Sequence, residues 1–125
     1  MAEQKKILIV DDMRTIRALL GAYLEGADYR YLEAESGVDA IQNLVVYQPD
    51  LVISDINMPG MSGIEFCNQA RDIPGFEELP VILITSDPEA ARGIGDLDEK
   101  QKNALLTKPL DPDEIRELVK RFLGE

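Results

Sequence analysis

Side chains that carry oxygen atoms or a positive charge stand where apolar runs of the sequence end. They are Asp11 and Asp12 after KILIV, Asp55 after LVIS, Thr85 and Ser86 after PVILI, and Lys108 after NALLT. Three close carboxylates repel one another unless a cation is present. Magnesium prefers oxygen ligands and is often held by one or two carboxylates and a phosphate oxygen, and an ammonium group suits a phosphate oxygen. If the fold gathers these residues, they form a site for a phosphoryl group and Mg²⁺.

Five short runs that favour β-structure would have to position these side chains. They cover residues 6–10, 29–34, 50–54, 80–85 and 103–107. Three of them are nearly continuous in apolar residues, which is typical of parallel strands that are covered on both faces. Each of these strands would therefore lie between two layers of helix.

Helices are predicted between and after these runs by apolar stripes and by start signals. Four are expected: residues 16–24, residues 38–47 after Ser36, the segment after the capping box of Ser62 and Glu65, and the segment from Pro112 after Asp111. A fifth helix is expected within residues 87–102. It should be broken or mobile, because Gly93 and Gly95 each cost about 1 kcal/mol relative to alanine inside a helix.

Alternation of strands and helices predicts an α/β fold with right-handed crossovers and a doubly wound parallel sheet. In such sheets, ligands bind beyond the carboxyl ends of the strands, near the point where the strand order reverses. The side chains at the ends of the first, third, fourth and fifth strands should therefore converge on one edge of the sheet. That convergence is what the proposed chemistry requires.

Composition limits the classes of partner and the size of the protein. The 125 residues are 45% apolar, which fits one domain over residues 1–125. A net charge of −11 opposes direct binding to nucleic acid and favours cations or basic protein surfaces. Cys67 is the only cysteine and is expected to pack in the core. No apolar run is long enough to cross a bilayer, so a soluble protein of the cytoplasm with no membrane partner is expected.

The motifs that end the strands carry a family resemblance along nearly the whole chain. They are the acidic pair after KILIV, the Asp55 of LVISDINMPGMSG, the Thr85 and Ser86 after PVILI, and the Lys108 and Pro109 of LLTKP. These separated motifs, in this order and spacing, resemble the receiver domain of two-component response regulators, including the single-domain chemotaxis type. The resemblance implies a flavodoxin-like sheet of five strands in the order 2-1-3-4-5, with five helices.

The resemblance also implies how the site would work. Asp55 would accept a phosphoryl group from a phosphohistidine on a sensor histidine kinase. Mg²⁺ would be held by Asp12, Asp55 and the main-chain carbonyl of Asn57, and Asp11 would help through a water molecule. Thr85 and Lys108 would contact the phosphoryl oxygens, and Ser86 is assigned to the same group. The peptide bond between Lys108 and Pro109 is expected to be cis.

By the same resemblance, the state of the site would be passed to a partner protein. Asn57 and Asp87 would tune the lifetime of the phosphoryl group. Movement of strands four and five and of the fourth helix would change a surface that includes residues 92–105 and the last helix. The family commonly has an aromatic switch residue where this chain has Leu105, so the signal is expected to depend on loop and helix movement near Gly93 and Gly95. A downstream target or a phosphotransfer protein would read that surface.

Other interpretations of the same residues remain open at this point. Taken singly, Asp11 or Asp12 could be a helix cap, and Thr85 and Lys108 could be ordinary strand and surface residues. The chain could be a stand-alone phosphorelay intermediate, or a receiver cut from a longer regulator. It could be a magnesium-dependent aspartyl-phosphate phosphatase, although Asn57 stands where such enzymes need a second acid. It could also be a binding module without phosphorylation. We expect no enzyme activity beyond the domain's own phosphorylation and dephosphorylation.

Overall fold

The computed structural model describes residues 4–87, 89, 97–98 and 103–125 of the chain. Its elements are β1 (Lys5–Val10), α1 (Arg14–Tyr23), β2 (Tyr29–Ala34), α2 (Gly37–Tyr47), β3 (Leu51–Asp55), α3 (Gly63–Arg71), β4 (Val81–Thr85), β5 (Leu97–Asp98), β6 (Asn103–Thr107) and α4 (Pro112–Phe122). Each of the five long strands begins and ends within one residue of a run predicted from the sequence.

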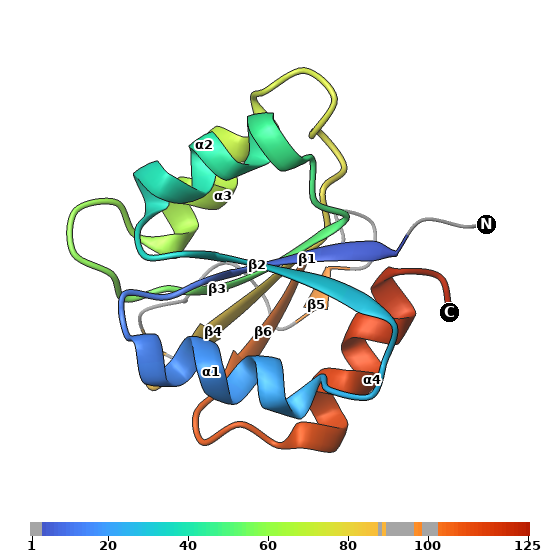
Figure 1. The fold of residues 1–125 in the computed structure, drawn as a ribbon. Helices are drawn as coiled ribbons and strands as arrows, with labels where there is room; N and C mark the ends of the chain where they lie inside the picture. The colour runs from blue at the N-terminus through green and yellow to red at the C-terminus, as the bar shows by residue number, and fades with distance from the viewer. Residues whose placement is uncertain (1–3, 88, 90–96, 99–102) are drawn as a thin grey trace.

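The strands form one twisted sheet between two layers of helices. Its order is β2-β1-β3-β4-β6-β5, and the five long strands are all parallel. In Figure 1, α2 and α3 cover one face of the sheet, and α1 and α4 cover the other. The doubly wound flavodoxin-like fold and the strand order 2-1-3-4-5 are therefore confirmed for the five parallel strands.

Alternate residues of the strands build two separate cores. Ile7, Ile9 and Ile53 lie in the core beneath α1 and α4, while Leu8 and Val52 lie in the core beneath α2 and α3. Successive side chains of a strand point to opposite faces of the sheet, so a strand that is covered on both faces must be apolar at every position. This explains the continuous hydrophobic runs. Cys67 is buried in the second core, as expected.

Two details of the predicted fold are wrong or fall outside the described residues. The described residues contain four helices rather than five, and most of the expected helix within 87–102 lies outside them, as do Gly93 and Gly95. Leu97 and Asp98, which lie inside that predicted helix, instead form a two-residue strand antiparallel to β6. Low helix propensity around the two glycines left this segment without a strong helical preference.

The helix starts follow the local signals with one exception. Ser36 and Ser62 accept hydrogen bonds from the amides of Asp39 and Glu65, and Asp111 accepts one from the amide of Asp113. Helix α1 begins differently, because its N-cap is Met13, which makes no side-chain cap. The alternative that Asp11 or Asp12 caps this helix is therefore wrong. No helix among the described residues has the length and apolar character needed to span a membrane.

Candidate functional site

Three carboxylates meet at the carboxyl ends of β1 and β3, which are neighbouring strands in the sheet. Oxygen atoms of Asp11, Asp12 and Asp55 all lie within 4.8 Å of one another. Asp11 and Asp55 are buried, while Asp12 is exposed. The pairing of Val10 with Ser54 aligns the two strands so that the residues that follow them come together. The structure therefore brings these three acids together at one edge of the sheet, as expected from the sequence.

Lys108 brings the one positive charge that the structure pairs with this cluster among the described residues. Its Nζ atom lies 3.7 Å from Oδ1 of Asp55, and its side chain is 26% exposed against 7% for Asp55. At this distance the two groups form an ion pair and not a hydrogen bond, and Oδ1 is buried without a hydrogen-bond partner. An unsatisfied buried carboxylate oxygen is costly. This oxygen is therefore available to a ligand.

The backbone around Lys108 supports this arrangement. Its amide donates a hydrogen bond of 2.9 Å to the carbonyl of Thr85, which ties the end of β6 to the end of β4. The Lys108 to Pro109 peptide bond is cis, as the family resemblance implied. The side chain of Lys108 is thereby carried to the same edge as Asp55.

The hydroxyl of Thr85 forms hydrogen bonds with two nearby residues, Asn57 and Asp87. Its Oγ1 accepts hydrogen bonds of 3.1 Å from the side-chain amide of Asn57 and from the backbone amide of Asp87, and donates to the carbonyl of Asp87. Thr85 is fully buried, whereas Asn57 and Ser86 are exposed. Asn57 and Asp87 thus both contact Thr85, and Ser86 lies beside it in the chain.

Burial governs the charge state of the two inner acids. The pKa of Asp11 is raised, mainly by burial and further by Asp55, against the lowering effects of the Met13 amide and of Lys108. The pKa of Asp55 is also raised, mainly by burial and further by Asp12, while Lys108 and the amides of Asn57 and Ile56 lower it. The charged form of each carboxylate is therefore disfavoured in the folded protein.

Asp11→Asn is expected to stabilise the fold. A raised pKa means that the folded state binds a proton more tightly than the unfolded state, so the free energy of unfolding falls as pH rises from the ordinary value near 3.8 through the raised pKa. The loss is therefore absent well below pH 3.8 and present at neutral pH. Asparagine removes the charge and can still accept the 2.8 Å hydrogen bond from the amide of Met13. A gain of about 0.5–2 kcal/mol is expected in urea melts at pH 7 without divalent cation.

Glu117→Gln is the matched control for that experiment, because it removes one negative charge from an exposed position on α4. Its effect should stay within about 0.5 kcal/mol. The gain from Asp11→Asn should also vanish at a pH low enough to protonate the cluster. An Asp11→Asn protein that is no more stable than the parent at pH 7 would contradict the assignment of burial strain to this site.

Two further residues hold the site together, and the sequence alone did not single them out. Arg17 donates from Nη1 to the carbonyl of Asp11 at 2.6 Å and pairs through Nε with Glu33 at 2.9 Å. Gly63 donates its amide to the carbonyl of Ile56 at 2.9 Å and packs directly against the backbone of Asp55. Arg17 falls on a helix face like any other charged residue, so no local signal marked it. Gly63 follows a capping serine, which explained it as a helix start only.

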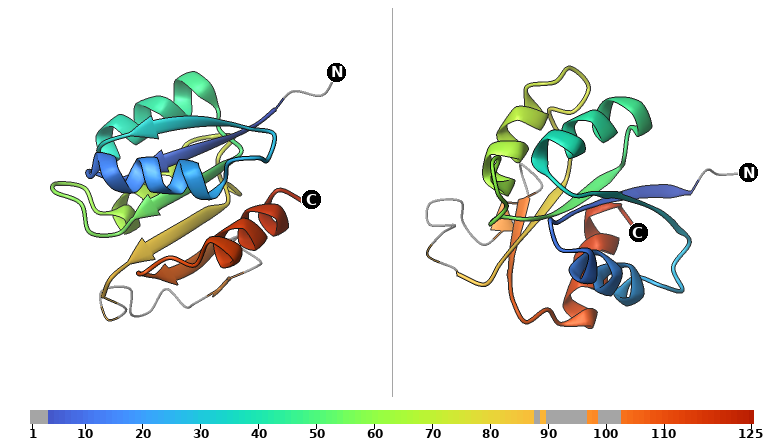
Figure 2. Two further views of the ribbon diagram at one scale, coloured as in Figure 1. Left: turned by 60° about the horizontal axis from the view of Figure 1, so that its bottom comes forward. Right: turned by 60° about the vertical axis from the view of Figure 1, so that its left-hand side comes forward.

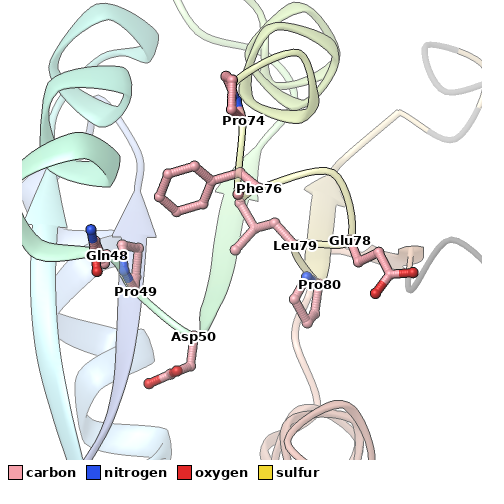
Figure 3. A pocket seen from close by; sticks show the side chains of 9 residues that line it. Gln48, Pro49, Asp50, Pro74, Phe76, Glu78, Leu79 and Pro80 are labelled. Atoms are coloured by element: carbon pink, nitrogen blue, oxygen red, sulfur yellow. The ribbon is translucent and has the colours of Figure 1, made fainter.

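A separate hollow of about 450 Å³ lies at the opposite edge of the sheet (Figure 3). Asp50 and Pro80, which directly precede β3 and β4, both line it, together with Phe76 and Leu79. This hollow is larger than a phosphoryl group needs and contains none of the clustered acids. The candidate site is therefore the shallow edge at Asp55 and not this hollow.

Comparison with known proteins agrees with the geometry. A family model described as the response regulator receiver domain matches residues 7–120. The sporulation initiation phosphotransferase F of Bacillus subtilis is 37% identical over 95% of this chain and 94% of its own length. The transcriptional regulatory protein ResD of the same organism is 38% identical over 96% of this chain. The chain spans only 48% of ResD.

The fold is shared with solved structures at lower sequence identity. The chemotaxis protein CheY4 of Vibrio cholerae superposes with a TM-score of 0.82 and 27% identity, covering 97% of this chain and all of the other. The family match covers most of the chain and includes every strand end described above. The chain belongs to the receiver domain family of two-component response regulators, a family of signal-transduction proteins.

Proposed function

We propose that this receiver domain is a phosphoacceptor switch and that Asp55 is the residue that accepts the phosphoryl group. The observation that carries the proposal is the Oδ1 atom of Asp55, which is buried, lacks a hydrogen bond and faces Lys108 at 3.7 Å. A nucleophile needs such a free oxygen, and a neighbouring ammonium can neutralise the charge of the arriving group. The phosphoryl donor would be a phosphohistidine on a sensor histidine kinase.

In this reaction, a carboxylate oxygen of Asp55 forms a bond to phosphorus as the bond from phosphorus to the imidazole nitrogen breaks. The electron pair of the broken bond returns to the imidazole ring. Phosphoryl transfer proceeds through a loose transition state, so the protein's task is to position the groups in line and to neutralise the equatorial oxygens. Lys108 supplies one such charge from the end of β6.

The acidic cluster fits a hard divalent cation, since it offers several carboxylate oxygens and one of them has no hydrogen-bond partner. Asp12, Asp55 and the main-chain carbonyl of Asn57 would hold Mg²⁺, with Asp11 acting through a water molecule. When bound, Mg²⁺ would relieve the repulsion among the acids and neutralise phosphoryl oxygens. The hydrogen bond from Arg17 to the carbonyl of Asp11 already fixes the backbone of this acid without a metal ion.

Thr85 would take part only after its present hydrogen bonds change. Its hydroxyl donates to the Asp87 carbonyl and accepts from Asn57, so it must exchange these partners to donate to a phosphoryl oxygen. The phosphoryl group adds a charge of about −1.5 to −2 near neutral pH, which is enough to draw a hydroxyl toward it. Ser86 would assist beside it. The resulting movement at the ends of β4 and β6 would then alter the surface read by a partner protein.

The domain would catalyse only its own phosphorylation and dephosphorylation. A phosphatase of small molecules is disfavoured because Asn57 lacks the acid that a second catalytic aspartate would provide. A module without phosphorylation is disfavoured because Asp55, Lys108 and both partner acids are present and gathered. Both stand-alone and multidomain relatives resemble the chain, so a phosphorelay intermediate and a part of a longer regulator are both compatible with this proposal.

Incubation with acetyl phosphate and Mg²⁺, followed by intact mass measurement, tests the proposal. The parent protein should gain the mass of one phosphoryl group, and Asp55→Asn should gain none because it lacks the nucleophilic carboxylate. Glu117→Gln, which removes a distant charge, should be labelled like the parent. An adduct that persists in Asp55→Asn would assign the acceptor to another residue and overturn the proposal.

A further inference from the structure

Helix α2 carries most of the large apolar side chains that the described residues expose. The four on this helix are Val38, Val45, Val46 and Tyr47, with exposed fractions of 59%, 59%, 68% and 41%. Outside α2, only Met13 and Leu19 among the described residues are exposed to this degree. The exposed apolar side chains of this part of the chain are therefore concentrated on one helix.

Three of these side chains share one face of α2. Val38 and Val45 are seven residues apart, which is close to two turns, and Val46 is about 100° further round the helix. Gln42 lies between Val38 and Val45 on the same exposed side. The opposite side of the helix packs inward through Ala40 and Leu44. We call Val38, Val45 and Val46 the α2 valine surface.

These valines are not explained by the stability of the domain. Valine has a lower helix propensity than alanine, because its branched side chain loses rotamers in a helix. None of the three gains the burial that would offset this loss, since each is more than half exposed. Single exposed apolar residues are ordinary, but a contiguous exposed group on one element marks an interaction surface.

The charge around the α2 valine surface indicates what would cover it. Residues 31–70 contain no Lys or Arg. Asp39 lies in α2, Glu35 contacts it through its amide, and Glu65 lies in α3, whereas Asp55 is buried in the site and Glu33 pairs with Arg17. Two cations contact the ends of this layer, and both bind main-chain oxygens: Lys6 donates to the carbonyl of Tyr47 and Arg71 donates to that of Leu79. Figure 2, right, shows α2 and α3 on the same face of the sheet. The exposed residues of these two helices include the three valines and Glu65, and residues 31–70 supply no positive charge to balance the acids.

We propose that the α2 valine surface is a docking site for a basic amphipathic segment of another protein, with apolar residues on the valines and Lys or Arg beside the acids. Charge complementarity selects this occupant over a second copy of the chain, which would bring the same acidic layer against itself at a net charge of −11. The surface lies outside the Asp55 site, so the docking goes beyond the phosphoacceptor function and does not depend on it.

Nuclear magnetic resonance titration with a synthetic helical peptide of Leu and Lys tests the proposal. Amide shifts should concentrate in residues 37–47, and the V38A/V45A/V46A variant should bind about tenfold more weakly, since it loses apolar contact at three positions. Alanine is the better helix former, so the variant should fold at least as well as the parent by circular dichroism. Leu19→Ala, an exposed apolar residue on α1, should bind like the parent.

Two further arms separate this proposal from its alternatives. A Leu and Glu analogue of the peptide should not bind, and Asp55→Asn should bind the Lys peptide as the parent does, even if it fails to be phosphorylated. Equal binding of both peptides, or shifts in residues 37–47 that persist in the triple variant, would overturn the proposal. So would sedimentation of the parent as a dimer that the triple variant abolishes, because a second copy would then be the occupant.

Discussion

Gly63→Ala is expected to lower the free energy of unfolding by about 1–3 kcal/mol, the usual cost of forcing extra atoms into a packed region. A Cβ atom at position 63 would come well inside 3.0 Å of the backbone carbonyl oxygen of Asp55 and would also crowd Ile56. Neither obstacle can rotate away, because both belong to the main chain at the end of β3. Urea denaturation followed by circular dichroism measures the loss.

Gly37→Ala is a closely matched control. Gly37 and Gly63 are each the first residue of a helix and each follows a serine N-cap. At position 37, the nearest atoms to the new Cβ all belong to the side chain of Met61, of which Sδ and Cγ can rotate away, while Cβ at 2.8 Å needs a small shift of its residue. The destabilisation should therefore be clearly smaller than for Gly63→Ala. Equal losses in the two variants would show that the close approach to Asp55 is not what requires glycine at position 63.

The same comparison reaches the function of the site. To relieve the clash, the backbone at Asp55 must shift away from α3, which moves the nucleophile relative to Lys108. Misplacement of a reacting group is costly in positioned catalysis. Labelling of Gly63→Ala by acetyl phosphate should therefore be slower than that of Gly37→Ala under conditions where both are folded.

The strands and helices were predictable because each strand is buried on both faces. The run of Leu51 to Ser54 must be apolar or small at every position, since alternate residues enter two different cores. The capping residues Ser36, Ser62 and Asp111 likewise act within a few residues of themselves. Features set by such local demands can be read from a single sequence.

Features set by contacts across the fold could not be read in the same way. Arg17 anchors the carbonyl of Asp11 from six residues away, and Gly63 is required by the backbone of Asp55 on another element. The partners of the Thr85 hydroxyl also depend on the geometry of the loop that follows β3. The start of α1 could not be settled locally either: Asp11 and Asp12 are residue types that cap helices, but Met13 is the N-cap and its own amide donates to the carboxylate of Asp11.

Leu105, which stands where the family commonly has an aromatic switch residue, bears on how the signal leaves the site and not on how the site is assembled. It lies in the middle of β6 and is packed against the core beneath α2 and α3. Lys108, three residues later, reaches Asp55 irrespective of what stands at position 105, because the backbone pairing of Thr85 with Thr107 fixes the strand end. The route expected for the signal, near Gly93 and Gly95, lies outside the described residues.

Lys108→Ala is expected to slow labelling of Asp55 by acetyl phosphate about 10- to 100-fold, since one fixed charge that meets the developing charge on phosphoryl oxygens is removed. The measurement is the rate of appearance of the phosphorylated mass at a fixed concentration of Mg²⁺. Lys120→Ala removes the same charge from an exposed position on α4 and should leave the rate within about twofold of the parent.

The stability of Lys108→Ala as a function of pH shows whether Lys108 also compensates the charge of the acidic cluster. Lys108 lowers the raised pKa values of both Asp11 and Asp55, so its loss raises them further and leaves the acids less compensated at neutral pH. Lys108→Ala should therefore be less stable than the parent at pH 7 and should recover as pH falls and the cluster is protonated. Asp11→Asn should change stability with the opposite sign, and the two changes together should be non-additive because the residues share one cluster.

The labelling rate of Lys108→Ala decides whether Lys108 takes part in the transfer. A rate like that of the parent would remove Lys108 from the proposed transfer step. A slow rate together with this pH dependence of stability would assign both effects to the single ion pair at Asp55.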